Sequence, residues 1–420
     1  AYDMSARLVG SEMCIRDRLK KIRKMQKEKY PHSETELKNE RDINILRTEM
    51  FCDAEEVLKE HKKNTLFYLE APTGSGKSNI ALNLSLQLMK ENPSLCKIFY
   101  IYPFNTLVEQ NLESLQKIYG QNPEVFESIA VINSMTPIKM TRKAKEKEEE
   151  TEQTMYYQKA LLDRQFLNYP MVLSTHVSLF DIMFDDKKES AFGFHQLINS
   201  VIILDEIQSY NNKLWGEISY FLKEFAYLMN TKIIIMSATL PDFDKLTDCI
   251  YPAVRLMMKR EKYFQHPCFR NRVKISYELM DSGNIEEDLV KHISQHAAKG
   301  KKILVEFIKK SSAYKFFKRL LEDERILCDV EYMSGDDSII ERSRILGKIG
   351  RMDKEIILVA TQVIEAGVDI DMDIGYKNIS KLDSEEQFMG RINRSCKKAG
   401  EVYFFKLDDE RKIYRGDIAV

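Results

Sequence analysis

The sequence predicts an α/β protein of two tandem domains, each built on a mostly parallel sheet that helices cover. Two series of short apolar segments carry this prediction, one after residue 44 and one after residue 271. Each segment is apolar nearly throughout, which is typical of strands buried on both faces of a parallel sheet. Helical stretches lie between the segments, as βαβ units require. The length of 420 residues is sufficient for about two or three domains.

The expected strands of the first domain are residues 65–70, 97–102, 171–174, 201–205 and 232–237. Those of the second domain are residues 302–308, 329–333, 355–361, 373–376 and 401–407. Tyr251-Pro252 and His266-Pro267 interrupt the pattern between the two series. The first domain is therefore predicted at 44–245, a linker at 246–270 and the second domain at 271–420.

Three further segments do not fit either series. Residues 1–18 show no periodicity and resemble translated adapter sequence, so they are expected to be an artefactual or disordered tail. Residues 19–43 are rich in Lys and Glu and are expected to form a solvated helix or linker. The charge run at 139–152 contains both signs, which favours a solvated helix or mobile insertion over a binding arm.

Composition excludes few function classes. The chain has 64 basic and 65 acidic residues, so net charge neither favours nor excludes nucleic acid. Its seven cysteines form no C-x-x-C pair, which fits reduced thiols better than a disulfide or zinc framework. No apolar run is long enough to span a bilayer, and no apolar signal core opens the chain. We therefore expect a cytoplasmic protein without a membrane partner.

A glycine-rich segment between a predicted strand and a predicted helix has the pattern of a phosphate-binding loop. It reads A-P-T-G-S-G-K-S at 71–78. Backbone N–H groups of such a loop converge on phosphate oxygens, aided by the positive end of the following helix. Lys77 is expected to reach the terminal phosphates and Ser78 to ligate Mg²⁺. The predicted nucleotide-binding residues of the loop are Thr73, Gly74, Ser75, Gly76, Lys77 and Ser78.

The predicted strand 201–205 ends in two carboxylates that can complete this site. Asp205 can hold Mg²⁺, and Glu206 can orient and deprotonate an attacking water. A helix cap or a surface acid pair would explain the same residues, but the phosphate loop upstream favours ATP hydrolysis. Ser237-Ala238-Thr239 follows the next predicted strand and could relay the nucleotide state, although a helix cap would explain it equally well.

Two arginines in the second half could act on the same phosphates. Arg391 and Arg394 lie three residues apart, a spacing that predicts one face of a helix. An arginine supplied across a domain cleft stabilises charge on a transferring phosphoryl group. Such a pair could instead form surface salt bridges, but the phosphate loop upstream favours a role in phosphoryl transfer.

These motifs, in this order, resemble a superfamily 2 helicase. More narrowly, they resemble the CRISPR-associated helicase of type I interference systems, the helicase–nuclease that the Cascade complex recruits. The likeness covers residues 42–408 and lies in the segments at 44–47, 71–78, 102–107, 174–176, 205–208, 237–241, 361–369 and 387–394. Ala71 stands where the general phosphate-loop pattern has Gly, as is common in superfamily 2 helicases, and Gln208 stands in a D-E-x-[HQ] box where many relatives have His.

The resemblance implies two RecA-like domains with ATP and Mg²⁺ between them and single-stranded DNA across both. It places Gln208 with Glu206, Arg391 and Arg394 in the catalytic group. It adds Gly367, Asp369 and Gln387 to the nucleotide-binding residues, and it implies strand contacts by Asn105, Thr106, His176, Thr361 and Gln362. Such contacts would be mainly to phosphate.

One feature of the family is missing from this sequence. Members commonly carry an HD nuclease before the helicase, but none of the seven histidines here is followed by Asp. We therefore expect no HD nuclease in this chain, and either a separate HD subunit or an HD domain missing from the sequence. A DEAD-box-like RNA helicase and an ATP-gated nucleic-acid clamp without turnover remain alternatives.

Overall fold

The computed structural model describes residues 43–408, with gaps at 120–125, 127, 134–149, 187, 211, 241–242, 247–251, 352–354, 365–367, 369 and 397–398. The predicted tail at 1–18, the predicted linker at 19–43 except its last residue, and most of the charge run at 139–152 lie outside these residues. Contacts divide the chain into two compact units. Of the described residues, the first contains those within 47–71 and 76–260, and the second contains those within 43–46, 72–75 and 261–408. Each unit is described by itself.

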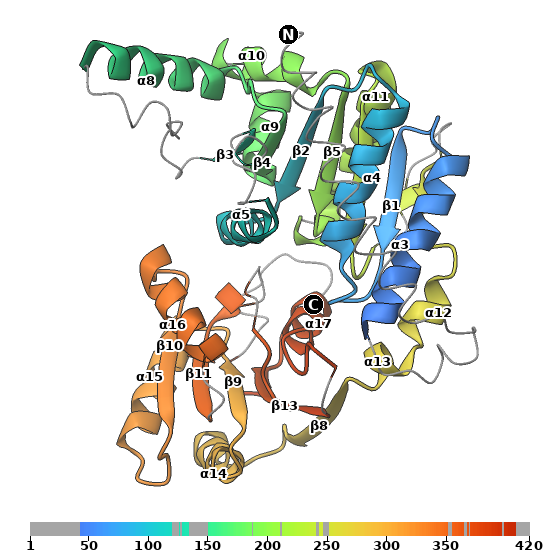
Figure 1. The fold of residues 1–420 in the computed structure, drawn as a ribbon. Coiled ribbons are helices and arrows are strands. Elements are labelled where there is room, and N and C mark those ends of the chain that lie inside the picture. The colour runs from blue at the N-terminus through green and yellow to red at the C-terminus, as the bar shows by residue number, and fades with distance from the viewer. Residues whose placement is uncertain are drawn as a thin grey trace. The chain divides into compact units, whose positions relative to one another are not determined.

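The first unit is built on a seven-stranded sheet in the order β3-β4-β2-β5-β6-β1-β7, and every neighbouring pair of strands in it is parallel (Figure 1). Its strands are β1 (Leu66–Glu70), β2 (Lys97–Tyr102), β3 (Ile129–Ile132), β4 (Met171–Thr175), β5 (Ser200–Asp205), β6 (Lys232–Ser237) and β7 (Val254–Arg255). Its helices are α3 (Ile43–Glu60), α4 (Lys77–Glu91), α5 (Asn105–Tyr119), α8 (Glu150–Gln165), α9 (His176–Phe184), α10 (Lys188–Leu197) and α11 (Trp215–Leu228). Because all strands are parallel, the carboxyl ends of β1, β2, β5 and β6 meet at one edge of the sheet.

The core of this unit lies on both faces of the sheet. On one face, alternate residues of five strands pack against buried side chains of α9, α10 and α11, including Leu179, Leu197 and Phe225. The intervening residues, such as Ile203 and Ile234, are also fully buried, and α4 contacts β5 and β6. Burial on both faces explains why these strands are apolar throughout.

The second unit is built on a six-stranded parallel sheet in the order β10-β11-β9-β12-β13-β8. Its strands are β8 (Val273–Leu279), β9 (Lys302–Glu306), β10 (Asp329–Met333), β11 (Ile356–Ala360), β12 (Ile374–Asn378) and β13 (Gly400–Phe405). Its helices are α12 (Arg260–Phe264), α13 (Pro267–Arg270), α14 (Ile285–Ala297), α15 (Lys310–Glu322), α16 (Ile339–Arg351) and α17 (Leu382–Met389). One face of the sheet packs against α14 and α15, and the other packs against α16 and α17. The strand order reverses between β9 and β12, which is where open α/β sheets place their ligands.

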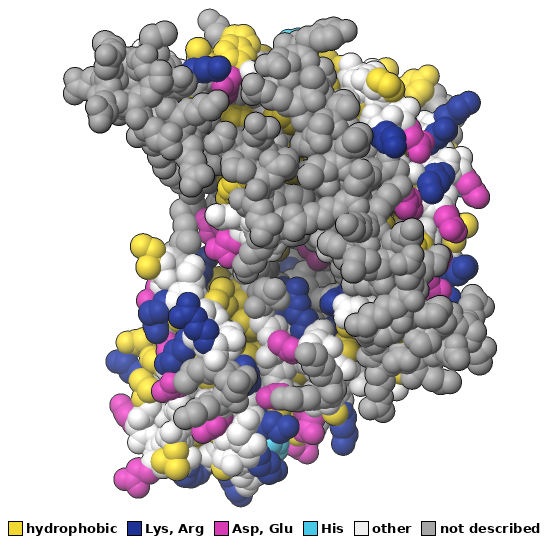
Figure 2. Space-filling model, in the orientation of Figure 1, with side chains coloured by type: hydrophobic (Ala, Val, Ile, Leu, Met, Phe, Trp, Pro, Cys, Tyr) yellow, Lys and Arg dark blue, Asp and Glu magenta, His cyan; other side chains and the backbone are white. Residues whose placement is uncertain are grey.

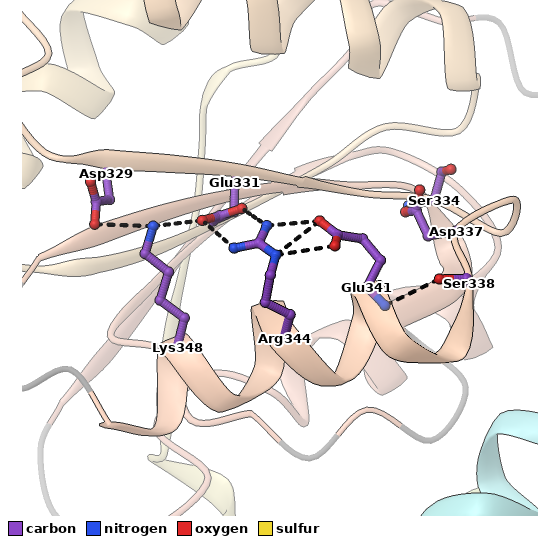
Figure 3. A network of polar contacts seen from close by, with 8 residues as sticks. All are labelled: Asp329, Glu331, Ser334, Asp337, Ser338, Glu341, Arg344 and Lys348. Atoms are coloured by element: carbon purple, nitrogen blue, oxygen red, sulfur yellow. Dashed lines mark hydrogen bonds and ion pairs between the residues drawn. The ribbon is translucent and has the colours of Figure 1, made fainter.

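A network of ion pairs attaches α16 to the edge strand β10 (Figure 3). Lys348 Nζ lies 2.6 Å from Glu331 Oε1 and 3.1 Å from Asp329 Oδ2. Arg344 Nη2 lies 2.8 Å from Glu331 Oε2. Figure 2 shows Lys and Arg side chains gathered in the region of α16. The carboxylates of this network offset part of that positive charge.

The predicted fold class, two tandem α/β domains with mostly parallel sheets, is confirmed. Three strands were not predicted, namely β3, β7 and β8. Each lies at a sheet edge. β7 has only two residues and β8 alternates apolar and polar residues, so neither forms a continuous apolar run, whereas the short apolar run of β3 was missed. Among the described helices, none is both long and apolar enough to cross a membrane.

Candidate nucleotide-binding site

The predicted phosphate loop connects β1 to α4 as expected. Gly74 and Gly76 have φ values of 85° and 87°, in the left-handed region that side chains with a Cβ rarely adopt. Gly76 is the N-cap of α4, so the loop ends at the positive end of a 15-residue helix. Lys77 is the first residue of that helix, and its Nζ donates to the Ala71 carbonyl at 3.0 Å. The Lys77 ammonium group therefore lies beside the loop whose bound phosphates it is expected to contact.

The two predicted acids stand at the end of β5. Asp205 is buried, and Glu206 has a φ of 51°, a left-handed conformation that is costly for a residue with a Cβ. The Glu206 N–H donates to the Met236 carbonyl at 2.9 Å, which holds this conformation. Burial and then the charge of Glu206 raise the pKa of Asp205 well above its usual value, while Lys77 opposes the shift. A cation beside Asp205 would supply the positive charge that this carboxylate pair lacks.

Gln208 links the acid pair to the predicted coupling tripeptide. Its Nε2 donates to Glu206 Oε2, and its Oε1 accepts from Ser237 Oγ at 2.6 Å. The Thr239 N–H in turn donates to Ser237 Oγ at 3.0 Å. Gln208 and Ser237 are both buried, and so is Ala238, which lies between Ser237 and Thr239 in the sequence. Hydrogen bonds of this kind are strengthened in a low dielectric, so the chain of contacts can transmit a shift of Glu206 to Thr239.

Two tyrosines on β2 belong to this site and were missed from the sequence. Tyr100 and Tyr102 are fully buried and stacked, with ring centroids 4.5 Å apart. The Tyr100 hydroxyl group contacts Ser78 and Met236 Sδ. Burial first, and the Asp205 charge after it, raise the pKa of Tyr100 well above its ordinary value, so this phenol stays protonated. The sequence signal that could have indicated them was the presence of two tyrosines, two residues apart, at the end of a predicted central strand.

Glu70, the residue immediately before the loop, was also missed. Its side chain is only 9% exposed and lies 2.9 Å from Arg260 Nη2. Arg255 Nη1 lies 3.8 Å from the other carboxylate oxygen. Arg255 belongs to β7, which pairs with β1 directly. The end of β1 is therefore fixed to the segment through which the chain leaves the first unit.

The residues of the first unit that are predicted to contact nucleic acid differ in their exposure to solvent. Asn105 and Thr106 are half-buried at the start of α5. His176 is only 3% exposed, and its ring stacks on Tyr210 with centroids 4.5 Å apart. Burial lowers the pKa of His176 to about 3. A contact between His176 and a nucleic-acid strand stays a prediction, and the burial of the ring argues against that contact.

The predicted residues of the second unit lie around β11 and α17. Thr361 is buried directly after β11, and Gln362 begins a short 3-10 helix, Gln362–Ile364. Gln387 lies in α17 and is half-buried. Gly367 and Asp369 lie outside the described residues, so their predicted contacts with the nucleotide remain predictions.

The expectation that Arg391 and Arg394 share one helix face is wrong. The helix α17 ends at Met389, and both arginines follow it in irregular backbone. Ile392 forms a parallel bridge with Met372, which ends the helical hydrogen bonding. The Arg391 side chain is buried, and its Nε donates to the Ile364 carbonyl at 3.1 Å.

The segment of Arg394 is held separately from that of Arg391. The Arg394 N–H donates to Asp371 Oδ1 at 2.7 Å, and the Ser395 N–H to Asp371 Oδ2 at 3.3 Å. The two arginines are thus fixed by different partners. A nucleotide role remains predicted for both.

The donor set at the first site fits Mg²⁺. Mg²⁺ prefers oxygen ligands and is commonly held by one or two carboxylates together with nucleotide phosphates. The Ser78 hydroxyl group and the Asp205 carboxylate supply that chemistry. Among the described residues, no group of three or more His, Cys, Asp or Glu side chains could hold a metal by itself.

Comparisons with known proteins found matches in both halves of the chain. Residues 53–246 match a model described as DEAD/DEAH box helicase, and residues 284–397 match one described as CRISPR-associated nuclease/helicase Cas3, C-terminal. The chain is 25% identical over 357 residues to a putative CRISPR-associated nuclease/helicase Cas3 of Methanocaldococcus jannaschii, covering 83% of this chain and 47% of that protein. The chain has a helicase core of the Cas3 type. A second Cas3 relative, from Methanothermobacter thermautotrophicus, is 26% identical and matches 78% of this chain and 38% of its own length.

Solved structures share the fold of this Cas3-type core. T. fusca Cas3 superposes with a TM-score of 0.63 at 15% identity, covering 87% of this chain and 48% of that one. The DEAD-box helicase Mss116, bound to ssRNA and UDP-BeF, gives 0.59 at 18% identity, covering 84% and 69%. Helicases of this fold confirm the predicted pair of RecA-like domains. The chain spans less than half the length of the two curated Cas3 relatives described above.

Proposed function

We propose that this Cas3-type core binds ATP with Mg²⁺ and uses its hydrolysis to move on and unwind DNA in type I CRISPR defence. The connection from the phosphate loop through the acid pair to Ser237 carries the proposal. A phosphate loop alone would indicate only nucleotide binding. Here the acids at the end of β5 are also hydrogen-bonded, through Gln208, to Ser237 at the end of β6. A change at the nucleotide can therefore shift residues outside the phosphate site.

Each residue of the site has a defined task in this proposal. The loop N–H groups and Lys77 bind the phosphates, and Ser78 with Asp205 would hold Mg²⁺. When bound, Mg²⁺ would neutralise charge on the phosphate oxygens. Glu206 orients the attacking water and accepts its proton, while Gln208 fixes the Glu206 carboxylate in place. Water positioned and deprotonated in this way forms a bond to the terminal phosphorus of ATP while the bond to the bridging oxygen breaks, which releases ADP and inorganic phosphate.

DNA and a CRISPR effector are the proposed partners. The relatives named above are CRISPR-associated nuclease/helicases, which supports a Cascade-type complex as the recruiting partner. A structurally similar helicase, Lhr of Mycobacterium smegmatis, was solved with ssDNA and AMP-PNP. We propose single-stranded DNA as the track.

Phosphate release with single-stranded DNA tests the enzymatic part. We expect Lys77→Ala and Glu206→Gln each to reduce DNA-stimulated turnover by at least about 100-fold. Lys90→Ala, at the exposed end of the same helix, is the matched control and should retain turnover. Unchanged release in Lys77→Ala would refute the site. Full activity of Glu206→Gln would show that Glu206 is not the general base. ATP binding by the wild type without phosphate release would instead support the clamp.

The nature of the nucleic acid is tested in the same assay. Mss116 was solved with ssRNA and is similar in fold, so an RNA motor is the second candidate. Stimulation by single-stranded DNA and not by RNA of the same sequence is expected. Stimulation by RNA alone would favour the DEAD-box-like alternative.

A further inference from the structure

A buried ion pair lies between the two strands at which the second sheet reverses its order. Lys377 of β12 stands opposite Glu306 of β9 in the parallel register, and its Nζ forms an ion pair with Glu306 Oε1. The two side chains are 0% and 1% exposed. We propose that Glu306 and Lys377 are positioning residues that hold α17 and, through it, Arg391.

Stability alone is a weak reason for such a pair. Removing two opposite charges from water costs several kcal/mol per ion, and apolar residues of similar size often replace a buried pair without loss of stability. Both strands are otherwise lined by buried apolar residues such as Val305 and Tyr376. A pair kept in this place is better explained by the geometry that it imposes on its neighbours.

The neighbour it contacts is α17. Lys377 Nζ donates to Ser384 Oγ at 2.7 Å and lies 5.5 Å from the centre of the Phe388 ring. Ser384 and Phe388 are four residues apart and so lie on one side of the helix. The helix has eight residues, too few to be stable by itself, so its place depends on such contacts.

The same side of α17 is packed directly on the strand. A Cβ on Gly375 would lie only 2.6 Å from the Phe388 ring, so the helix approaches β12 as closely as a glycine permits. Phe388 is fully buried, and its carbonyl accepts from the Arg391 N–H at 2.8 Å. A short path of contacts therefore runs from Lys377 through Phe388 to the Arg391 backbone.

The end of this path is a residue with a predicted catalytic role. The Arg391 side chain extends back to the Ile364 carbonyl, next to the segment predicted to bind nucleotide. A displacement of α17 would move the Arg391 backbone and strain this bond. The functional consequence rests on the proposed ATPase, in which misplacement by about 1 Å can cost about 100-fold in rate.

The test separates positioning from stability. Glu306→Leu combined with Lys377→Met removes both charges and keeps the volume, so the fold should be retained. In the full chain, amide exchange of residues 382–394 should become faster, while exchange in β9 and β12 stays slow. Turnover at saturating ATP and DNA should fall by about 10- to 100-fold, with KM for ATP changed less. Ser384→Ala, which keeps both charges, should produce the same effects more weakly, and Ser311→Ala on the exposed side of α15 should produce neither.

Each result decides the proposal. A folded double variant with unchanged exchange in 382–394 would overturn it, as would wild-type turnover despite faster exchange. If the double variant does not fold, Ser384→Ala decides by the same two measurements. Because exchange is independent of ATP, an inactive wild-type protein would refute the proposed function and leave the positioning of α17 still measurable.

Discussion

Acidification should destabilise the first unit through His176. The ring is buried, and that burial lowers its pKa from 6.5 to about 3, against a weak opposing effect of the Asp205 backbone. In the unfolded chain the ring titrates near its usual value, so the unfolded state binds more protons below pH 6.5. Stability is therefore complete above about pH 6.5 and is lost as the pH falls toward 3. Between pH 7 and pH 5, the linkage relation gives a loss of about 2 kcal/mol from this residue.

The single tryptophan of the chain makes this loss measurable. Trp215 begins α11 in the first unit and packs against Phe243 at 5.8 Å, so its fluorescence reports the unfolding of that unit. Urea unfolding should be followed at pH 7 and pH 5 for the wild type and for His176→Phe. Phenylalanine keeps a ring stacked on Tyr210 but does not titrate.

The comparison uses the difference between the two pH values and not absolute stability. Other groups titrate in both proteins, so their contributions cancel in this difference. The wild type should lose about 2 kcal/mol more than His176→Phe between pH 7 and pH 5. An equal loss in the two proteins would show that His176 is not held neutral, and the burial argument would fail.

Three further substitutions test other parts of the fold. Lys232→Met should destabilise the first unit by about 1–3 kcal/mol, read by Trp215 fluorescence, because Nζ donates to three backbone carbonyls after α3 at 2.7 to 3.2 Å. Gly375→Ala should destabilise the second unit by about 1–3 kcal/mol, because the added Cβ overlaps the Phe388 ring, and faster amide exchange in β12 would show it. Arg344→Ala should leave the thermal midpoint of the second unit nearly unchanged in calorimetry, because the side chain is half exposed and Lys348 still pairs with Glu331. A large fall in that midpoint would contradict this view of the network in Figure 3.

The central strands and the phosphate loop could be predicted because their causes are local. A strand buried on both faces is apolar throughout, and a left-handed turn before a helix calls for glycine, as at Gly74 and Gly76. The edge strand β8 was missed because its sequence, Val273–Leu279, alternates apolar and polar residues and lacks the continuous apolar run on which the prediction relied. Its pairing with β13 depends on residues more than a hundred positions away.

The candidate site divides in the same way. The acid pair was visible as two carboxylates after an apolar run, and Gln208 was visible only through the family resemblance. Tyr100 reaches the site through strand register, which a single sequence does not display. The position of Arg391 was predicted incorrectly because an intrahelical spacing was assumed where a bridge from Ile392 to Met372 ends the helix.

The place of β1 in its sheet has a consequence for how the protein is made. The strand that carries the phosphate loop is synthesised first but lies between β6 and β7, the last two strands of its sheet. Since no parallel pair can close through a tight turn, β1 has no partner until β6, which ends at Ser237, has left the ribosome, and its second partner β7 follows at residue 255. The nucleotide site should therefore be the last part of the first unit to form during translation. Nascent chains that end before β6 should leave an apolar strand unpaired and should depend on chaperones.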